Sequence, residues 1–251
     1  LGFYQMAYRI SNMLETEITQ VISGVAFPAY AKIQTKQDKL QNTYFRIMKL
    51  TLLISLPITT GMIFLAPEFT QVFLGEKWMS MVVVIQLLAV AGLIKSIVST
   101  GSPLFVGSGF PKYEFFMQLI RGLIIIIVIY PLIVFMGISG AAIGVILSIA
   151  GMLVIWYPLS QKITRAPWRK YFDTFWPPLF CSLLMAGSIY IAKLYWNPIG
   201  QPLGLAILIF VSIVIMSIGI YAASIWLLQK YYPDYDIFKE VKFLYQSMKR
   251  K

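Results

Sequence analysis

The sequence contains no histidine and a single cysteine, and only 12% of its 251 residues are charged. Without histidine, the chain lacks the commonest metal ligand and the usual general base, so an enzyme or a metal site is poorly supported. One cysteine, Cys181, excludes an intramolecular disulfide. A soluble domain carries about 25% charged residues, so this composition is typical of a membrane protein instead.

Hydrophobic residues make up 59% of the chain, and several apolar runs reach about 20 residues, the length that crosses a bilayer as a helix. These runs predict an all-α fold, a polytopic membrane helix bundle of about seven transmembrane helices. The expected helices are 3–30, 44–67, 80–106, 113–136, 138–160, 174–196 and 203–230. Pro57 lies inside the second and removes one backbone hydrogen bond from it. Small residues in 137–145 permit close packing of the fifth helix against a neighbour.

The net charge of +11 comes from lysines and arginines that mostly lie in the loops after the first, third and fifth helices and in the tail. This alternation is better explained by membrane orientation than by nucleic acid, and it predicts a cytoplasmic C-terminus. The basic, amphipathic tail, 231–251, is expected to lie on the membrane lipids. The chain opens with Leu1 rather than methionine, within a spanning pattern, which predicts the C-terminal part of a longer protein.

The first expected helix has a polar face, which is unusual for a segment that crosses a membrane. At 100° per residue, its polar side chains fall within about 60° of one line, opposite Ile10 and Leu14. They are Gln5, Tyr8, Arg9, Asn12, Thr16, Thr19, Gln20 and Ser23. A helix with one polar and one apolar face inside a membrane protein usually lines a water-filled cavity, which is the prediction here.

Three basic residues, Arg9, Lys95 and Arg121, lie inside expected helices. Each costs roughly 2.5–3.5 kcal/mol at the centre of a lipid-facing helix, so each is a candidate for substrate binding. For Arg9 and Arg121, the alternative is that the side chain reaches the membrane surface, and Arg121 also has Glu114 on its own face. For Lys95 the alternative is a buried pair with Glu15 or Glu17.

Glu15 and Glu17 are the acidic residues of the first expected helix. Transporters use carboxylates within the membrane to relay protons or to bind cations, so both are candidates for ion coupling. The alternative is that they balance the charge of Lys95 or Arg9. Cations around a wet cavity favour an anionic guest, and guanidinium suits phosphate in particular. No metal or cofactor is implied.

Several motifs in order resemble the polysaccharide transporter branch of the MOP flippase superfamily, which includes the Wzx-type exporters. The patterns are G-x-Y-x-x-A-Y-R, F-P-A with a basic-Ile-Gln ending, F-x-G-x-x-W, G-x-P-K and G-x-x-G-A-A. The matching residues are Gly2, Tyr4, Ala7, Tyr8, Arg9, Phe27, Pro28, Ala29, Lys32, Ile33, Gln34, Phe73, Gly75, Trp78, Gly109, Pro111, Lys112, Gly137, Gly140, Ala141 and Ala142. The resemblance covers almost the whole chain.

The resemblance implies helices eight to fourteen of a fourteen-helix transporter, with the N-terminal half missing. Residues 1–160 would form its second lobe, 161–230 two additional helices, and 231–251 the tail. Proteins of this kind reside in the bacterial cytoplasmic membrane and move undecaprenyl-pyrophosphate-linked oligosaccharides across it by alternating access. In the related lipid II flippase, the matching helix places an arginine in the central cavity to meet the pyrophosphate, and that position corresponds to Arg9.

Two alternatives to a lipid-linked oligosaccharide flippase are considered. A multidrug or cation antiporter of the same superfamily would favour an acidic cavity, which Arg9, Lys95 and Arg121 argue against. An integral membrane ligase or polymerase acting on lipid-linked sugars would place catalytic residues on sizeable outward loops. The outward loops expected here are short, at 68–79, 137 and 197–202, so the prediction is a transporter without enzymatic activity.

Overall fold

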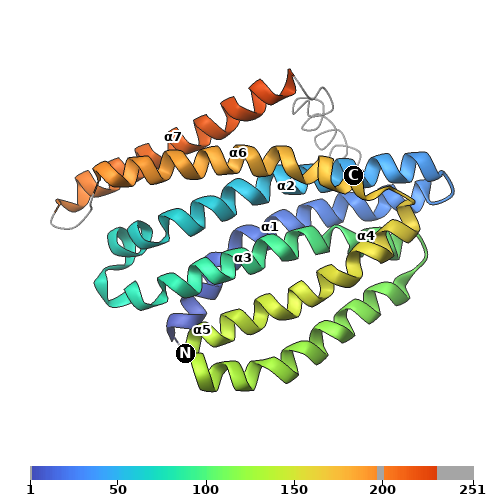
Figure 1. Cartoon of the computed structure of the whole chain (residues 1–251), viewed down its shortest axis with the longest axis horizontal. Helices are drawn as coiled ribbons and strands as arrows, with labels where there is room; N and C mark the ends of the chain where they lie inside the picture. The colour runs from blue at the N-terminus through green and yellow to red at the C-terminus, as the bar shows by residue number, and fades with distance from the viewer. Residues whose placement is uncertain (1, 197–200, 231–251) are drawn as a thin grey trace.

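A helical bundle makes up the computed structural model, which describes residues 2–196 and 201–230, with the backbone alone at 12–23 and 25 (Figure 1). Its elements are α1 (Gly2–Ile33), α2 (Gln37–Phe69), the π-helical turn η1 (Thr70–Leu74), the 3₁₀ turn η2 (Glu76–Met81), α3 (Val82–Ser99), α4 (Gly101–Gly107), α5 (Pro111–Thr164), α6 (Trp168–Tyr195) and α7 (Leu203–Gln229). Over this part of the chain there is no strand, and the predicted all-α class is confirmed. The predicted amphipathic tail, 231–251, lies outside the described residues.

Helix α5 consists of two antiparallel arms. Its 54 residues would extend about 81 Å as one straight helix, far more than the ~30 Å core of a bilayer. At Gly137 the backbone leaves the helical region, with φ 59° and ψ −131°, and the chain folds back on itself (Figure 1). Glycine tolerates this positive φ without steric cost. The two predicted helices, 113–136 and 138–160, are therefore confirmed as the arms of this hairpin.

Five helices among the described residues are long and apolar enough to cross a membrane, and α5 is one of them. With α5 counted as two crossings, α3 and α4 taken as one, and α1 added, the predicted arrangement of seven helices is recovered. The break between α3 and α4 falls at Thr100, where Pro103 lacks the N–H that would bond to the Ser99 carbonyl. The chain is therefore part of a multi-pass membrane protein.

Glycines hold the two arms of α5 in close contact. A Cβ added at Gly140 would overlap the carbonyl group of Leu132 on the opposite arm. A Cβ at Gly144 would lie 3.3 Å from Cδ1 of Ile129, and one at Gly151 would overlap the side chain of Ile124. The predicted close packing through small residues is confirmed, because at Gly140 a side chain would collide with the backbone of the opposite arm.

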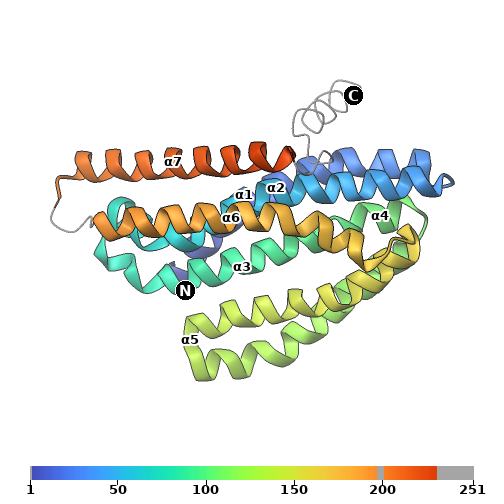
Figure 2. The same ribbon diagram turned by 45° about the horizontal axis from the view of Figure 1, so that its top comes forward.

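Helix α2 lies inside the bundle and contacts α1, α3, α6 and α7 (Figure 2). It contains Pro57 and Pro67, yet it stays helical from Gln37 to Phe69. Each proline lacks the N–H that would bond to the carbonyl four residues earlier, which leaves the carbonyls of Leu53 and Ile63 without their helical donors. An unpaired carbonyl is costly inside a membrane, so these positions require donors from elsewhere.

Both carbonyls accept a hydrogen bond from a neighbouring helix. The Tyr221 hydroxyl of α7 donates to the Leu53 oxygen at 2.9 Å, and the Gln86 amide of α3 donates to the Ile63 oxygen at 2.8 Å. One turn from Pro67, the Lys193 ammonium of α6 donates to the Phe64 oxygen at 2.9 Å. The prolines of α2 thus create acceptor sites that bind α7 and α3, and the Phe64 carbonyl, which no proline frees, binds α6.

Candidate functional site

The polar face of α1 is exposed where its side chains are described. Gln5, Tyr8 and Arg9 all project from the bundle, and the ring of Tyr8 stacks on that of Tyr4 with centroids 6.1 Å apart. Arg9 therefore presents a guanidinium on an exposed surface formed partly by amide and phenol groups. Such a surface is poorly suited to lipid tails and well suited to an aqueous cavity.

The opposite face of α1 packs against the rest of the bundle. Ala7 is fully buried, and Ser11 is buried with its hydroxyl 3.4 Å from the carbonyl oxygen of Ile85 on α3. The small side chains of Ala7 and Ser11 permit α1 and α3 to approach closely. This contact orients α1 and thereby determines which way Arg9 points.

Four predicted site residues of α1 lie where only the backbone is described: Asn12, Glu15, Thr16 and Glu17. Their assignment to substrate binding or to ion coupling remains a prediction. The proposed pairs of Glu15 or Glu17 with Lys95 or Arg9 also remain predictions.

Lys95 and Arg121 line one polar cavity of about 210 Å³, between α3, α4 and the two arms of α5. Glu114 also lines it, and its carboxylate accepts a hydrogen bond of 2.8 Å from the Gln118 amide. The remaining lining residues are Val98, Ser99, Ser102, Met117, Ile149 and Met152. We call this space the polar cavity. Among the described side chains that line it, two are basic and one is a carboxylate, so this lining carries a net positive charge.

The grouping of Lys95 with Arg121 was not predicted, although the sequence contains a signal for it. Lys95, Ser99 and Ser102 are spaced i, i+4, i+7, as are Glu114, Gln118 and Arg121. Each set therefore forms a polar stripe on one helix face. Two such stripes on consecutive apolar segments indicate helices whose polar faces meet, which is what the polar cavity shows.

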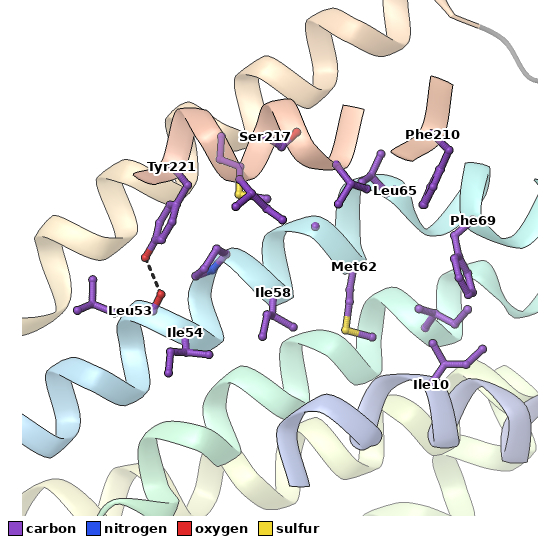
Figure 3. A pocket seen from close by; sticks show the side chains of 16 residues that line it. Ile10, Leu53, Ile54, Ile58, Met62, Leu65, Phe69, Phe210, Ser217 and Tyr221 are labelled. Atoms are coloured by element: carbon purple, nitrogen blue, oxygen red, sulfur yellow. Dashed lines mark hydrogen bonds between the residues drawn. The ribbon is translucent and has the colours of Figure 1, made fainter. Parts of the chain in front are cut away.

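A second, larger cavity of about 550 Å³ lies on the other side of α2 and is almost entirely apolar (Figure 3). Five helices line it: α2 contributes half of the residues, and α1, α3, α6 and α7 contribute Ile10, Ile85, Met185 and Phe210 among others. We call this space the apolar cavity. It was missed in the sequence, because apolar residues from five segments look the same whether they pack tightly or leave a space.

The two hydroxyl groups that line the apolar cavity are both hydrogen bonded. The Ser217 hydroxyl donates to the Ile213 carbonyl of its own helix at 2.6 Å. The Tyr221 hydroxyl donates across the cavity wall to Leu53 (Figure 3, dashed line). With its polar groups engaged in this way, the cavity suits a hydrocarbon guest. Ile10 of α1 lines the cavity, whereas Arg9 does not, because consecutive residues of a helix point about 100° apart.

Comparison with known proteins finds several that are similar to this chain. A family model described as "Polysaccharide biosynthesis protein" matches residues 1–83. The lipopolysaccharide biosynthesis protein WzxC of Escherichia coli strain K12 is 27% identical over 72% of this chain and 37% of its own length. The teichuronic acid biosynthesis protein TuaB of Bacillus subtilis strain 168 is 25% identical over 46% of this chain and 24% of its own.

A solved structure shares the fold across most of the chain. The lipid II flippase MurJ, in an inward closed conformation, matches 91% of this chain and 47% of its own with a TM-score of 0.73 and 16% sequence identity. An uncharacterised membrane protein in the cps region of Klebsiella pneumoniae is 23% identical over 90% of this chain and 46% of its own. The chain spans less than half the length of each relative.

The fold is that of one half of a MurJ-like flippase, a helical membrane transporter. The predicted resemblance to the polysaccharide transporter branch of the MOP flippase superfamily is confirmed, because a polysaccharide biosynthesis family model, two polysaccharide biosynthesis proteins and a flippase structure all match.

Proposed function

We propose that the protein containing this chain moves lipid-linked oligosaccharides, carried on undecaprenyl pyrophosphate, across the bacterial cytoplasmic membrane for polysaccharide biosynthesis. It does so without enzymatic activity. The observation that carries this proposal is the exposed guanidinium of Arg9 on the polar face that it forms with Gln5 and Tyr8. Arginine binds phosphate oxygens through two parallel hydrogen bonds. This suits a pyrophosphate group that passes through the water-filled cavity which the polar face of α1 is predicted to line.

The two cavities support an amphiphilic cargo. A lipid-linked sugar has a long apolar chain and an anionic pyrophosphate, and it therefore requires two chemically different environments. The apolar cavity offers about 550 Å³ of hydrocarbon surroundings beside α1, and the polar cavity offers Lys95 and Arg121. In this proposal Arg9 makes the main contact with pyrophosphate, and Lys95 and Arg121 attract the anionic group from the cytoplasmic side.

The proposal is tested by substituting Arg9 in the full-length protein and measuring surface polysaccharide. Arg9→Ala removes the forked donor and is expected to abolish surface polysaccharide, whereas Arg9→Lys keeps the charge and is expected to retain part of it. The matched control is Arg169→Ala, because Arg169 is exposed and interacts with Asp173 one turn along α6. Immunoblotting of the membrane fraction checks that all variants accumulate. Wild-type polysaccharide from Arg9→Ala would remove the proposed role.

The orientation of the chain is proposed from its charge pattern, with the loops at 33–37, 107–111 and 164–168 in the cytoplasm. In a full-length protein without other cysteines, Arg169→Cys is expected to react with a membrane-impermeant maleimide only after the cells are opened. Lys77→Cys, exposed at the other end of the bundle, is expected to react in intact cells. The reverse pattern would overturn the topology.

The division of the chain into a five-helix lobe, 1–160, and two additional helices, 161–230, also stays a proposal. Glu15 and Glu17 are proposed to couple transport to a proton or a cation. If so, Glu15→Gln or Glu17→Gln would reduce the dependence of transport on the ion gradient, as measured in proteoliposomes with an imposed gradient.

A further inference from the structure

Helix α7 is held to the bundle in an environment that offers little hydrophobic driving force. Inside a membrane, lipid tails are as apolar as leucine side chains, so helices associate through close packing and through hydrogen bonds between them. Within α7, the hydroxyls of Ser212 and Ser217 donate to carbonyls of α7 itself, at 2.8 and 2.6 Å. These two bonds do nothing to hold α7 against its neighbours.

Tyr221 differs from these serines because its hydroxyl bonds to another helix. It donates at 2.9 Å to the carbonyl oxygen of Leu53 on α2, and the Tyr221 side chain is buried. Leu53 lies four residues before Pro57, so its carbonyl is the one that proline leaves without a helical donor. The donor from α7 and the unpaired acceptor of α2 thus satisfy each other.

The same arrangement occurs a second time on α2, which indicates that it is a means of joining helices. Pro67 leaves the Ile63 carbonyl unpaired, and the Gln86 amide of α3 donates to it at 2.8 Å. In both places a proline creates an acceptor inside the membrane, and a side chain from a different helix supplies the donor. The bond from Tyr221 lies at the wall of the apolar cavity, which Pro57 and Leu53 also line (Figure 3).

We propose that Tyr221 is a positioning residue: by bonding to the carbonyl that Pro57 leaves free, it holds α7 in place as one wall of the apolar cavity. If the proposed function is correct, the position of α7 determines whether the cavity can hold the apolar chain of the cargo. Tyr221 then acts on transport through α7 and not through contact with the anionic part of the cargo.

The test measures the position of α7 by electron paramagnetic resonance in the full-length protein. Spin labels are attached at Lys39→Cys, in the first turn of α2, and at Lys230→Cys, directly after α7, because both positions are exposed. All other cysteines are replaced, including Cys181. Tyr221→Phe keeps the ring and removes the bond, so the population with α7 displaced should rise about threefold, as expected for one hydrogen bond between membrane helices.

A double-mutant cycle identifies the acceptor. Pro57→Ala returns an N–H to the Leu53 carbonyl and should by itself displace part of the α7 population, because the carbonyl is then already bonded. Since both changes act on one bond, their effects should not add: Tyr221→Phe with Pro57→Ala should match Tyr221→Phe alone. The control is Ser217→Ala, which removes a hydroxyl from the same cavity without breaking a bond between helices and should leave the distances unchanged.

Two results would overturn the proposal: an unchanged distance distribution in Tyr221→Phe, or fully additive effects of the two substitutions. Surface polysaccharide, measured on the same variants, separates this proposal from the proposed function. Displacement of α7 with an equal loss of polysaccharide supports both. Displacement with normal polysaccharide supports the positioning of α7 and overturns its role in transport. The proposed flippase function is tested separately by Arg9→Ala, in which α7 is expected to stay in place while surface polysaccharide is lost. Normal polysaccharide from Arg9→Ala would count against that function.

Discussion

The two arms of α5 and the pair α6–α7 lie on opposite sides of the bundle and are held by different forces (Figure 2). The arms of α5 meet through glycines: Gly140 faces the backbone of Leu132, whereas Gly144 and Gly151 face isoleucine side chains of the opposite arm. Helices α6 and α7 are joined to α2 by polar side chains, Lys193 and Tyr221, that donate to its carbonyls. Glycine contacts thus bring the arms of α5 together, whereas α6 and α7 combine apolar packing against α2 with directional hydrogen bonds to its carbonyls.

The cavities beside these two pairs differ in the polarity of their lining. The polar cavity lies against α5 and contains Lys95, Glu114 and Arg121. The apolar cavity lies beneath α7, and its two hydroxyls are already bonded. The charged residues thus lie beside the glycine-packed pair, and the hydrocarbon-lined space lies beside the pair that is hydrogen bonded to α2. The following substitutions test this comparison, from the largest expected effect to the smallest.

Gly140→Ala is expected to destabilise the α5 hairpin most strongly. Its new Cβ would overlap the carbonyl of Leu132, so the arms must separate, which we expect to cost about 3 kcal/mol. The unfolding free energy in detergent measures this effect. Gly122→Ala is the control on the same hairpin, because a Cβ at Gly122 has no neighbour within 4 Å. Equal losses from the two substitutions would contradict close packing at Gly140.

Glu68→Ala is expected to weaken the attachment of α6 to α2. The Glu68 carboxylate lies 2.8 Å from the Lys193 ammonium, with the two side chains only 10% and 26% exposed, so its removal leaves a poorly solvated cation. We expect a loss of about 2 kcal/mol, below the range for fully buried pairs because Lys193 is partly solvated.

The exposed pair Arg169–Asp173, at 3.8 Å with side chains 89% and 59% exposed, is the control for this effect. Asp173→Ala should cost less than about 0.5 kcal/mol, since exposed pairs contribute little. Both variants are compared by unfolding in detergent. Similar values for Glu68→Ala and Asp173→Ala would show that burial does not strengthen the pair of Glu68 with Lys193.

Lys95→Ala is expected to lower transport without unfolding the protein. The substitution removes one of the two cations of the polar cavity, and we expect surface polysaccharide to fall about tenfold at equal protein levels, as for about 1.4 kcal/mol of lost binding. Lys39→Ala, at an exposed position of α2, is the control and should have no effect. Normal transport by Lys95→Ala would restrict the anion site to α1.

Gln86→Leu is expected to have the smallest effect. It removes the hydrogen bond to the Ile63 carbonyl at nearly constant side-chain volume, and hydrogen bonds between membrane helices contribute about 0.6 kcal/mol on average. In a Pro67→Ala background, where the carbonyl regains its helical donor, the effect should shrink further. An undiminished loss there would argue against the proline as the origin of the interaction.

The sequence by itself determined the helices and the faces that they present. Apolar runs of membrane-spanning length predict the crossings after α1, and Gly137 is predicted as the turn between two of them. Spacing by 100° per residue predicted the face that Gln5, Tyr8 and Arg9 share, and the structure leaves all three exposed. These features depend on residues close together in the chain, where helical geometry relates position to direction.

Only the tertiary structure decided which faces meet. It brought Lys95 into one cavity with Arg121, and it placed the hydroxyl of Tyr221 at the carbonyl of Leu53. It also assembled an apolar cavity from five helices. The sequence of each of these helices resembles that of a helix that packs without leaving a cavity. Periodicity describes the direction of a side chain about its own helix axis, but a cavity depends on the distance between axes, which the packing of whole side chains sets.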